Sequence, residues 1–200
     1  TDTRIGLVDV HQHVIAERTI KTNAERLAEE VVEEIGKTVL ALLEQQKLPM
    51  DQCVGAGIGV PGTVDRKQGV VRYSNNIRWE DVDIVKEMGK YLPLPIYIAN
   101  DADCAALGEV TAGAGRDYQD VIMLTLGTGV GGGIILDGNI YEGKGIGGSE
   151  LGHMVIVENG EQCTCGRKGC LEAYVSETAL IRDVRRAVGK EQTPEAIFAA

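Results

Sequence analysis

One histidine and three cysteines near the end of the chain have the residue types and the spacing of a metal site. They are His153, Cys163, Cys165 and Cys170. One imidazole and three thiolates form a common ligand set of a four-coordinate structural zinc. Because four protein ligands leave no open position, we expect the metal to shape the loop and not to activate water. The alternative is a loop of free thiols, which the neighbouring glycines disfavour, since a tight metal loop needs unusual backbone angles.

The other cysteines and two of the histidines fit simpler roles. Cys53 and Cys104 lie in apolar surroundings, which predicts ordinary buried thiols. His11 and His13 fall in a predicted turn, so we expect them on the surface. Nothing else marks a secreted protein, and a cysteine cluster in a reducing compartment indicates metal binding before disulfides.

A second candidate site is the glycine-rich segment 126–133, which follows an apolar strand. Glycines there allow successive backbone N–H groups to converge on phosphate oxygens. The dinucleotide-binding fingerprint also fits the glycine spacing, but that motif must open a helix, whereas residues 134–136 predict a strand. Residues 138–144 match the start of a P-loop, yet Gly145 replaces the required serine or threonine. We therefore expect a phosphate-binding turn, and a glycine-rich turn without a ligand is the alternative.

Several carboxylates and one amide are candidates for binding or catalysis. Asn100 and Asp101 stand where a predicted strand passes into a helix. Asp101 could act there as a general base with Asn100 binding a hydroxyl, or either residue could simply cap the helix. Glu150 and Glu172 lie close in sequence to the expected metal ligands. A rigid metal loop could present them to sugar hydroxyls, and the alternative is that both are surface glutamates.

The apolar pattern predicts alternating strands and helices. Strands are expected over residues 4–9, 14–21, 53–60, 94–99, 121–126 and 132–136, with a hairpin turn at 138–139. Helices are expected over 24–47, 84–91, 102–112 and 176–188, with another helix start at Thr193-Pro194-Glu195. Such alternation is typical of an α/β protein, and we expect two lobes, residues 1–115 and 116–200.

Composition and charge exclude several classes of protein. The 200 residues are 44% hydrophobic and 25% charged, as in a globular protein with a real core. The net charge of −10 argues against a nucleic-acid surface, which needs a basic patch. The apolar runs are too short to cross a bilayer, and no signal-peptide pattern opens the chain. We expect a cytoplasmic protein that binds small molecules, with neither nucleic acid nor a membrane as partner.

Together these motifs resemble the ROK family of repressors and sugar kinases. The most specific match runs from Glu150-Leu-Gly-His153 to Cys163-Thr-Cys-Gly-Arg-Lys-Gly-Cys170-Leu-Glu172, which is similar to the family's zinc signature in order and spacing. Residues 59–62, Asn100-Asp101 and the segment 126–133 support it, so the resemblance spans essentially the whole chain. It implies the actin-like, ribonuclease-H-like ATPase fold, with two lobes and a cleft between them.

The resemblance also implies roles for individual residues. Asp101 would be the base that deprotonates a sugar hydroxyl, most often at carbon six. The sugar would be held by Gly62, Asn76, Asn100, Asp101, Glu150, His153 and Glu172. Phosphates of ATP would be bound by Thr3, Gly127, Thr128, Gly129, Val130, Gly131, Gly132 and Gly133. His153 would serve twice, with one nitrogen on zinc and the other toward a sugar hydroxyl.

The implied activity is the phosphorylation of a hexose by ATP and Mg²⁺, with glucose as the first choice and glucose 6-phosphate as product. A homodimer is expected. The alternatives are an N-acetylmannosamine kinase, a sugar-sensing repressor with a basic DNA-binding segment before residue 1, and a non-catalytic carbohydrate-binding module stabilised by zinc. The intact Asp101 and the glycine-rich segment favour the kinase, since neither a sensor nor a binding module needs both.

The chain departs from the family pattern at both ends. Family members begin with a phosphate loop of the type Asp-x-Gly-Gly-Thr, and Thr1-Asp2-Thr3 looks like the end of that loop. The aspartate that would organise magnesium is therefore missing, and the family continues past the last residue with adenosine-binding elements. We expect a fragment that keeps the sugar and zinc sites but binds ATP poorly.

Overall fold

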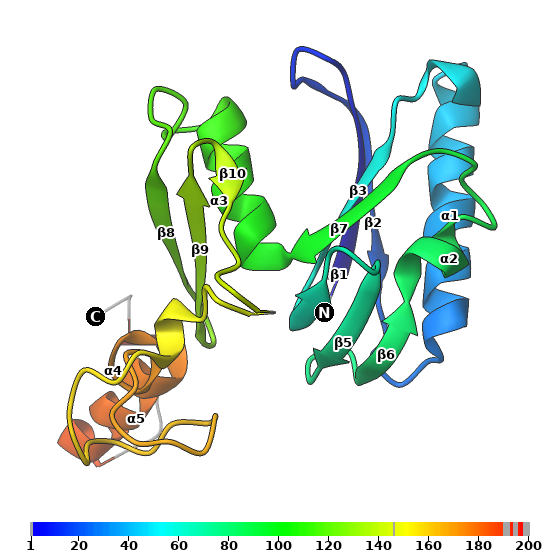
Figure 1. Cartoon of the computed structure of the whole chain (residues 1–200). Helices are drawn as coiled ribbons and strands as arrows, with labels where there is room; N and C mark the ends of the chain where they lie inside the picture. The colour runs from blue at the N-terminus through cyan, green and yellow to red at the C-terminus, as the bar shows by residue number, and fades with distance from the viewer. Residues whose placement is uncertain (1, 146, 190–192, 194–195, 198–200) are drawn as a thin grey trace. The chain divides into compact units, whose positions relative to one another are not determined.

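The chain folds into two compact units, Thr1–Cys104 and Ala105–Ala200, each described here by itself. The computed structural model describes residues 2–145, 147–189, 193 and 196–197, and Figure 1 gives the order of their elements. The sequence places the boundary between lobes after residue 115, whereas the contacts divide the chain within helix α3 (Asp101–Ala112). The start of this helix belongs with the first unit because Cys104 lies against the backbone of Gly59.

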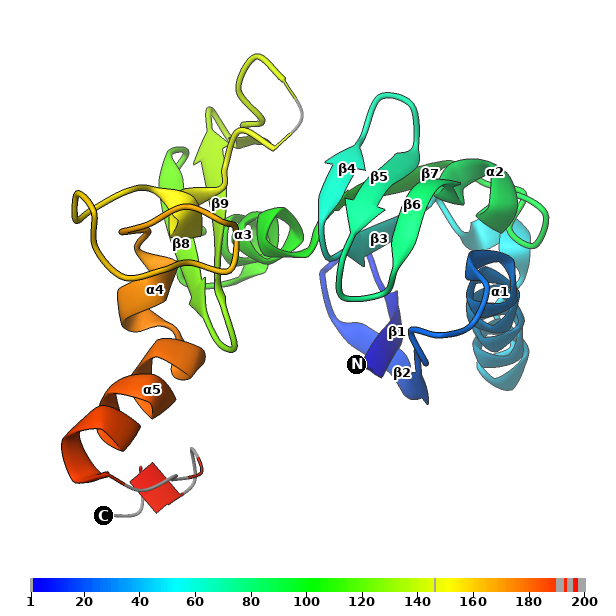
Figure 2. The ribbon, with the colours of Figure 1, turned by 90° about the horizontal axis from the view of Figure 1, so that it is seen from below.

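The strands of the first unit form separate small sheets. β1 (Asp2–Val8) and β2 (Val14–Lys21) make an antiparallel hairpin, while β3 (Ala56–Val60) and β7 (Ile96–Asn100) pair in parallel. β4 (Thr63–Asp65), β5 (Val70–Ser74) and β6 (Trp79–Asp83) run side by side as an antiparallel sheet (Figure 2). The sequence missed this last sheet because strands of three to five residues are too short to show a clear period.

Helices of the first unit are shorter than the sequence predicts. α1 (Ala28–Gln45) begins four residues late, because residues 23–26 form a turn closed by a hydrogen bond from Arg26 N–H to Asn23 C=O. A short 3₁₀ helix, η1 (Met50–Gln52), follows it. α2 (Ile84–Met88) is capped at its start by Asp83, whose carboxylate accepts a hydrogen bond from Lys86 N–H at 2.9 Å, and Gly89 is its C-cap.

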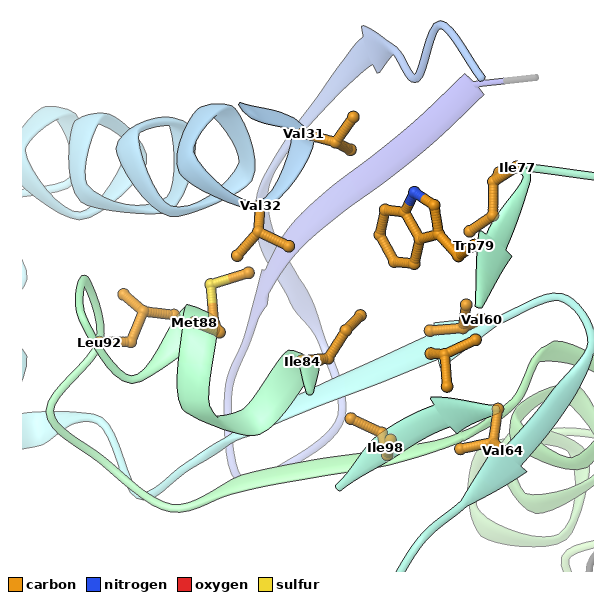
Figure 3. Close-up of a cluster of buried hydrophobic side chains, with 11 residues drawn as sticks. Val31, Val32, Val60, Val64, Ile77, Trp79, Ile84, Met88, Leu92 and Ile98 are labelled. Carbon is orange, nitrogen blue, oxygen red and sulfur yellow. The ribbon is translucent and has the colours of Figure 1, made fainter. Parts of the chain in front are cut away.

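One apolar core holds the first unit together. Figure 3 shows side chains from α1, α2 and the surrounding strands converging around Trp79, which is 6% exposed. The buried members are Val31, Val32, Val60, Val64, Val71, Ile77, Trp79, Ile84, Met88, Leu92 and Ile98. Each such side chain contributes about 1.5–3 kcal/mol by leaving water. The core therefore fixes the end of β7, where Asn100 and Asp101 follow.

The second unit combines a small antiparallel sheet with short helices. β8 (Val121–Leu126), β9 (Val130–Leu136) and β10 (Asn139–Ile140) pair in chain order, and β9 begins two residues earlier than expected. The 3₁₀ helix η2 (Leu151–His153) and the helices α4 (Glu172–Val175) and α5 (Glu177–Val188) follow. Ser176 caps α5 as expected, since its hydroxyl accepts a hydrogen bond from Ala179 N–H at 3.1 Å.

Several smaller expectations can be compared with the structure. His11 and His13 are exposed, as expected. Cys53 and Cys104 were expected to be buried, but both are half-buried, because Cys53 ends the exposed turn η1 and Cys104 lies in the first turn of α3. The expected helix start at Thr193 falls partly on Pro194 and Glu195, which lie outside the described residues. Among the described helices, none combines the length and apolarity of a membrane span.

Two helical glycines should respond in opposite ways to alanine. A Cβ on Gly36 in α1 would lie 2.6 Å from Cγ of Tyr91, whereas a Cβ on Gly108 in α3 would meet nothing within 4 Å. We expect Gly36→Ala to destabilise the protein by about 1–3 kcal/mol through overpacking. Gly108→Ala should stabilise it by up to about 1 kcal/mol through helix propensity. Urea unfolding of both variants checks this, and a stabilising Gly36→Ala would contradict the packing around Tyr91.

Candidate functional site

The four predicted metal ligands meet in the second unit. One ligand atom from each of His153, Cys163, Cys165 and Cys170 lies within 4.8 Å of all the others. Nδ1 of His153 is 3.7 Å from Sγ of Cys163, and the sulfurs of Cys165 and Cys170 are also 3.7 Å apart. A tetrahedral zinc with Zn–S bonds of about 2.3 Å separates its sulfurs by about 3.8 Å. The donors and their spacing therefore fit a structural zinc.

The backbone of the zinc loop, residues 153–170, holds these ligands in place. Cys163 N–H donates to the carbonyl of Arg167 at 2.9 Å, and Gly166 N–H donates back to the carbonyl of Cys163 at 3.1 Å. The guanidinium of Arg167 also donates to the carbonyl of His153 at 3.0 Å. This tight turn presents Cys163 and Cys165 on the same side, and a bridge between Val155 and Cys170 closes the loop.

The pKa values of Cys163 and Cys165 are shifted in opposite directions because their surroundings differ. Burial raises the pKa of the Cys163 thiol to about 11. The backbone N–H of Arg167 lowers the pKa of Cys165, which is exposed, to about 6. Without metal, Cys163 therefore carries a proton at neutral pH, and a metal ion has to displace that proton in order to bind.

The glycine loop, residues 127–129, connects β8 to β9 and is held from the side of α5. Glu177 N–H donates to the carbonyl of Gly127, and the hydroxyl of Thr178 donates to the carbonyl of Thr128, both at 2.8 Å. With these carbonyls engaged, the N–H groups of Thr128 and Gly129 have no partner within the described part of the chain. The loop can therefore offer two adjacent backbone donors to an anion.

Four more residues expected to bind phosphate, Val130, Gly131, Gly132 and Gly133, belong to strand β9. Val130 opens the strand, and Gly131, Gly132 and Gly133 pair with β8. A Cβ on Gly132 would lie 2.7 Å from the side chain of Leu151 in η2. The glycines of β9 thus let η2, which ends at the zinc ligand His153, pack closely on the sheet.

Glu172 joins the two loops of the second unit. Its Oε2 accepts a hydrogen bond from Val130 N–H at 3.0 Å, and its Oε1 accepts one from the hydroxyl of Thr164 at 2.8 Å. Burial alone would raise the pKa of Glu172, but these hydrogen bonds lower it below its usual value. No motif in the sequence pointed to the part played by Thr164, nor to the contacts that Glu177 and Thr178 make with the glycine loop.

In the first unit, Asn100 and Asp101 stand at the junction of β7 and α3. Oδ1 of Asn100 accepts a hydrogen bond from Ala102 N–H at 2.8 Å, so Asn100 caps the helix. Its amide also donates to the carbonyl of Gly62 at 2.9 Å, which brings the loop between β3 and β4 to the same place. Asp101 is exposed, and only one of its carboxylate oxygens accepts a hydrogen bond, from Ala102 N–H at 3.0 Å, within the described residues.

The remaining predicted site residues are spread over both units. Asn76 is exposed in the turn between β5 and β6 of the first unit. Thr3 lies in β1, where its hydroxyl is 2.7 Å from that of Thr22. Glu150 is exposed and directly precedes η2 in the second unit, so it sits beside His153 along the chain. The binding roles of these residues stay predictions.

Loss of one buried metal ligand should empty the zinc site. We expect Cys170→Ser to remove the bound zinc and to lower the melting temperature by several degrees, since about 1 kcal/mol shifts a chain of this size by about 2–4 °C. Cys53→Ser is the matched control, because Cys53 lies outside the cluster. Metal analysis and thermal unfolding measure both effects. Full zinc content in Cys170→Ser would refute the site.

The zinc content of the unaltered protein should fall as pH is lowered, because protons compete for the thiolates. Metal analysis over a range of pH values checks this.

Comparison with known proteins shows which family this chain belongs to. All 200 residues match the sequence model of the ROK family. A glucokinase of Thermotoga maritima is 38% identical over 191 residues, which are 95% of this chain and 59% of the relative. A xylose repressor of Bacillus subtilis is 36% identical over 132 residues, which are 66% of this chain and 34% of the relative. The chain thus spans less than two thirds of either relative.

Two solved structures share the fold. The ROK hexokinase of Thermus thermophilus superposes with a TM-score of 0.87 at 30% identity, covering 100% of this chain and 65% of that one. A ROK glucokinase of Streptomyces griseus, solved with glucose and AMPPNP, gives 0.76 at 34% identity, covering 94% of this chain and 59% of that one. The expected α/β fold of the actin-like ATPase class is therefore confirmed, and the chain belongs to the ROK family.

Proposed function

We propose that this protein is a hexose kinase that transfers a phosphoryl group from ATP to a sugar hydroxyl, with glucose as the first substrate to test. The observation that carries this proposal is the exposure and the hydrogen bonding of the Asp101 carboxylate. It is exposed at the end of a buried parallel strand and keeps one carboxylate oxygen without a partner among the described residues. A general base needs such a free oxygen within reach of the hydroxyl that it deprotonates.

Each binding element has a part in this proposal. A hydrogen bond already joins Asn100 to Gly62, so this part of the binding site is in place before the sugar arrives. Asn76 would add a further contact with the sugar. In the second unit, Glu150 would accept a hydrogen bond from a sugar hydroxyl, and Nε2–H of His153 would donate one to a sugar hydroxyl oxygen. If Nδ1 of His153 binds zinc, as its 3.7 Å distance from Cys163 indicates, Nε2 remains for a hydroxyl.

Phosphate binding would depend on the glycine loop. The free N–H groups of Thr128 and Gly129 would donate to phosphate oxygens, with Thr3 as a further contact. ATP supplies the phosphoryl group and Mg²⁺ balances its charge, while the protein aligns the reactants. Zinc would have a structural role, because the protein fills all four of its positions.

A sugar-sensing repressor is the second candidate, and the match to a xylose repressor favours it specifically. A sensor needs sugar binding but neither a catalytic base nor a phosphate loop. One oxygen of Asp101 and two N–H groups of the glycine loop have no partner among the residues that the structure describes, and this favours the kinase. An N-acetylmannosamine kinase would use the same residues with a different sugar.

An ADP-release assay on the complete protein tests the proposal. With Mg-ATP and glucose we expect turnover, and Asp101→Asn should lower kcat by about 10²- to 10⁴-fold, the usual contribution of a general base. Asp117→Asn, which changes an exposed aspartate beside Arg116, is the matched control and should leave kcat unchanged. No turnover with any hexose, in protein that retains zinc, would reject the kinase and direct attention to DNA binding.

A further inference from the structure

Glu172 is the one side chain whose carboxylate bonds to the zinc loop with one oxygen and to the backbone beside the glycine loop with the other, as far as the described residues show. Oε1 faces the zinc loop, where it accepts from the hydroxyl of Thr164 at 2.8 Å and lies 3.5 Å from Sγ of the zinc ligand Cys163. Oε2 accepts from Val130 N–H at 3.0 Å, directly after the glycine loop. A single carboxylate thus spans both loops.

The approach of Glu172 explains why position 129 is a glycine. A Cβ at Gly129 would lie 2.6 Å from Oε2 of Glu172, closer than real Cβ atoms come to other heavy atoms. A side chain at this position would therefore displace the carboxylate from Val130. The glycine loop is shaped to receive this contact as well as to expose its own N–H groups.

The contact also completes the support of the glycine loop. On one side, the start of α5 holds the carbonyls of Gly127 and Thr128. On the other side, Glu172 holds Val130 N–H, and α4, which begins with Glu172, directly follows the zinc ligand Cys170. Movement of the zinc loop would therefore reach the glycine loop through the side chain of Glu172 as well as through the start of α5.

We propose that Glu172 is a positioning residue, through which zinc binding sets the geometry of the glycine loop and hence its affinity for the phosphates of a nucleotide. This inference rests on the proposed function, in which the glycine loop binds ATP. It gives Glu172 a task in addition to the sugar contact that the family resemblance implies. A sugar ligand would affect hexose binding, whereas a positioning residue affects nucleotide binding even when no sugar is present.

The test uses the complete protein and three variants. Glu172→Ala removes the contacts to both loops, and Thr164→Val removes the shorter of the two contacts to the zinc loop while sparing the metal ligands. Glu158→Ala changes an exposed glutamate of the same loop and is the matched control. For each protein, one measures zinc content, amide hydrogen exchange over residues 127–133, and the Kd of AMPPNP without sugar.

We expect Glu172→Ala to retain zinc, to exchange the Val130 amide at least about tenfold faster, and to raise the Kd of AMPPNP about tenfold, as befits a lost charge-assisted hydrogen bond. Thr164→Val should show the same changes to a smaller degree, and Glu158→Ala should match the unaltered protein. Chelation of zinc should accelerate exchange over 127–133 in the unaltered protein and should accelerate it less in Glu172→Ala, because that variant has already lost the part of the coupling that Glu172 carries.

Other outcomes separate the inference from the proposed function. Unchanged exchange and unchanged AMPPNP affinity in Glu172→Ala, with only the KM for glucose raised, would overturn the inference and leave Glu172 as a sugar ligand. If the unaltered protein binds no AMPPNP, the proposed function fails, and with it the nucleotide part of the inference, while the exchange data still decide whether Glu172 links the loops. If Glu172→Ala loses zinc, the Thr164→Val variant decides whether Glu172 links the two loops. Normal exchange over residues 127–133 in that variant would overturn this link.

Discussion

The four candidate metal ligands are the groups that could close the zinc loop, on which the rest of the second unit depends. Apolar packing cannot provide that closure, because the core cluster there contains only Cys163, Cys170 and Ala173 among the described residues. The apolar run 154–157 inside the loop stays 42–53% exposed. A long loop without its own core loses more conformational entropy on folding than its few contacts return. Coordination of a metal by His153 and the three cysteines would supply the missing free energy.

Closure of this loop has consequences beyond the metal. Cys170 is followed at once by α4 and then by α5, so fixing the cysteine also fixes where both helices begin. The first turn of α5 then bonds to the carbonyls of Gly127 and Thr128. An anion-binding turn works only if its carbonyls point away from the ligand, because carbonyl oxygens repel phosphate. The zinc loop and the helix starts thus orient a loop that has few contacts of its own.

The first unit solves a similar problem with apolar packing instead of metal. Its core surrounds Trp79 and holds the parallel pair β3 and β7 (Figure 3). Asn100 then uses its amide twice, to cap α3 and to hold the carbonyl of Gly62. Asp101 next to it is left exposed. The residue with the structural task and the residue proposed for catalysis are adjacent, which explains why the sequence allowed both roles for either one.

Local spacing and period were enough to identify the family, the candidate zinc ligands, the long helices and the position of the glycine loop. The sequence by itself could not find the sheet β4–β5–β6, whose strands are too short to show a period. Nor could it show that Glu172 bonds to Val130, since the two positions are 42 residues apart. Which backbone groups are free and which are engaged depends on such distant partners. Only the tertiary structure decides them, because hydrogen bonds form between groups that folding, and not sequence, brings together.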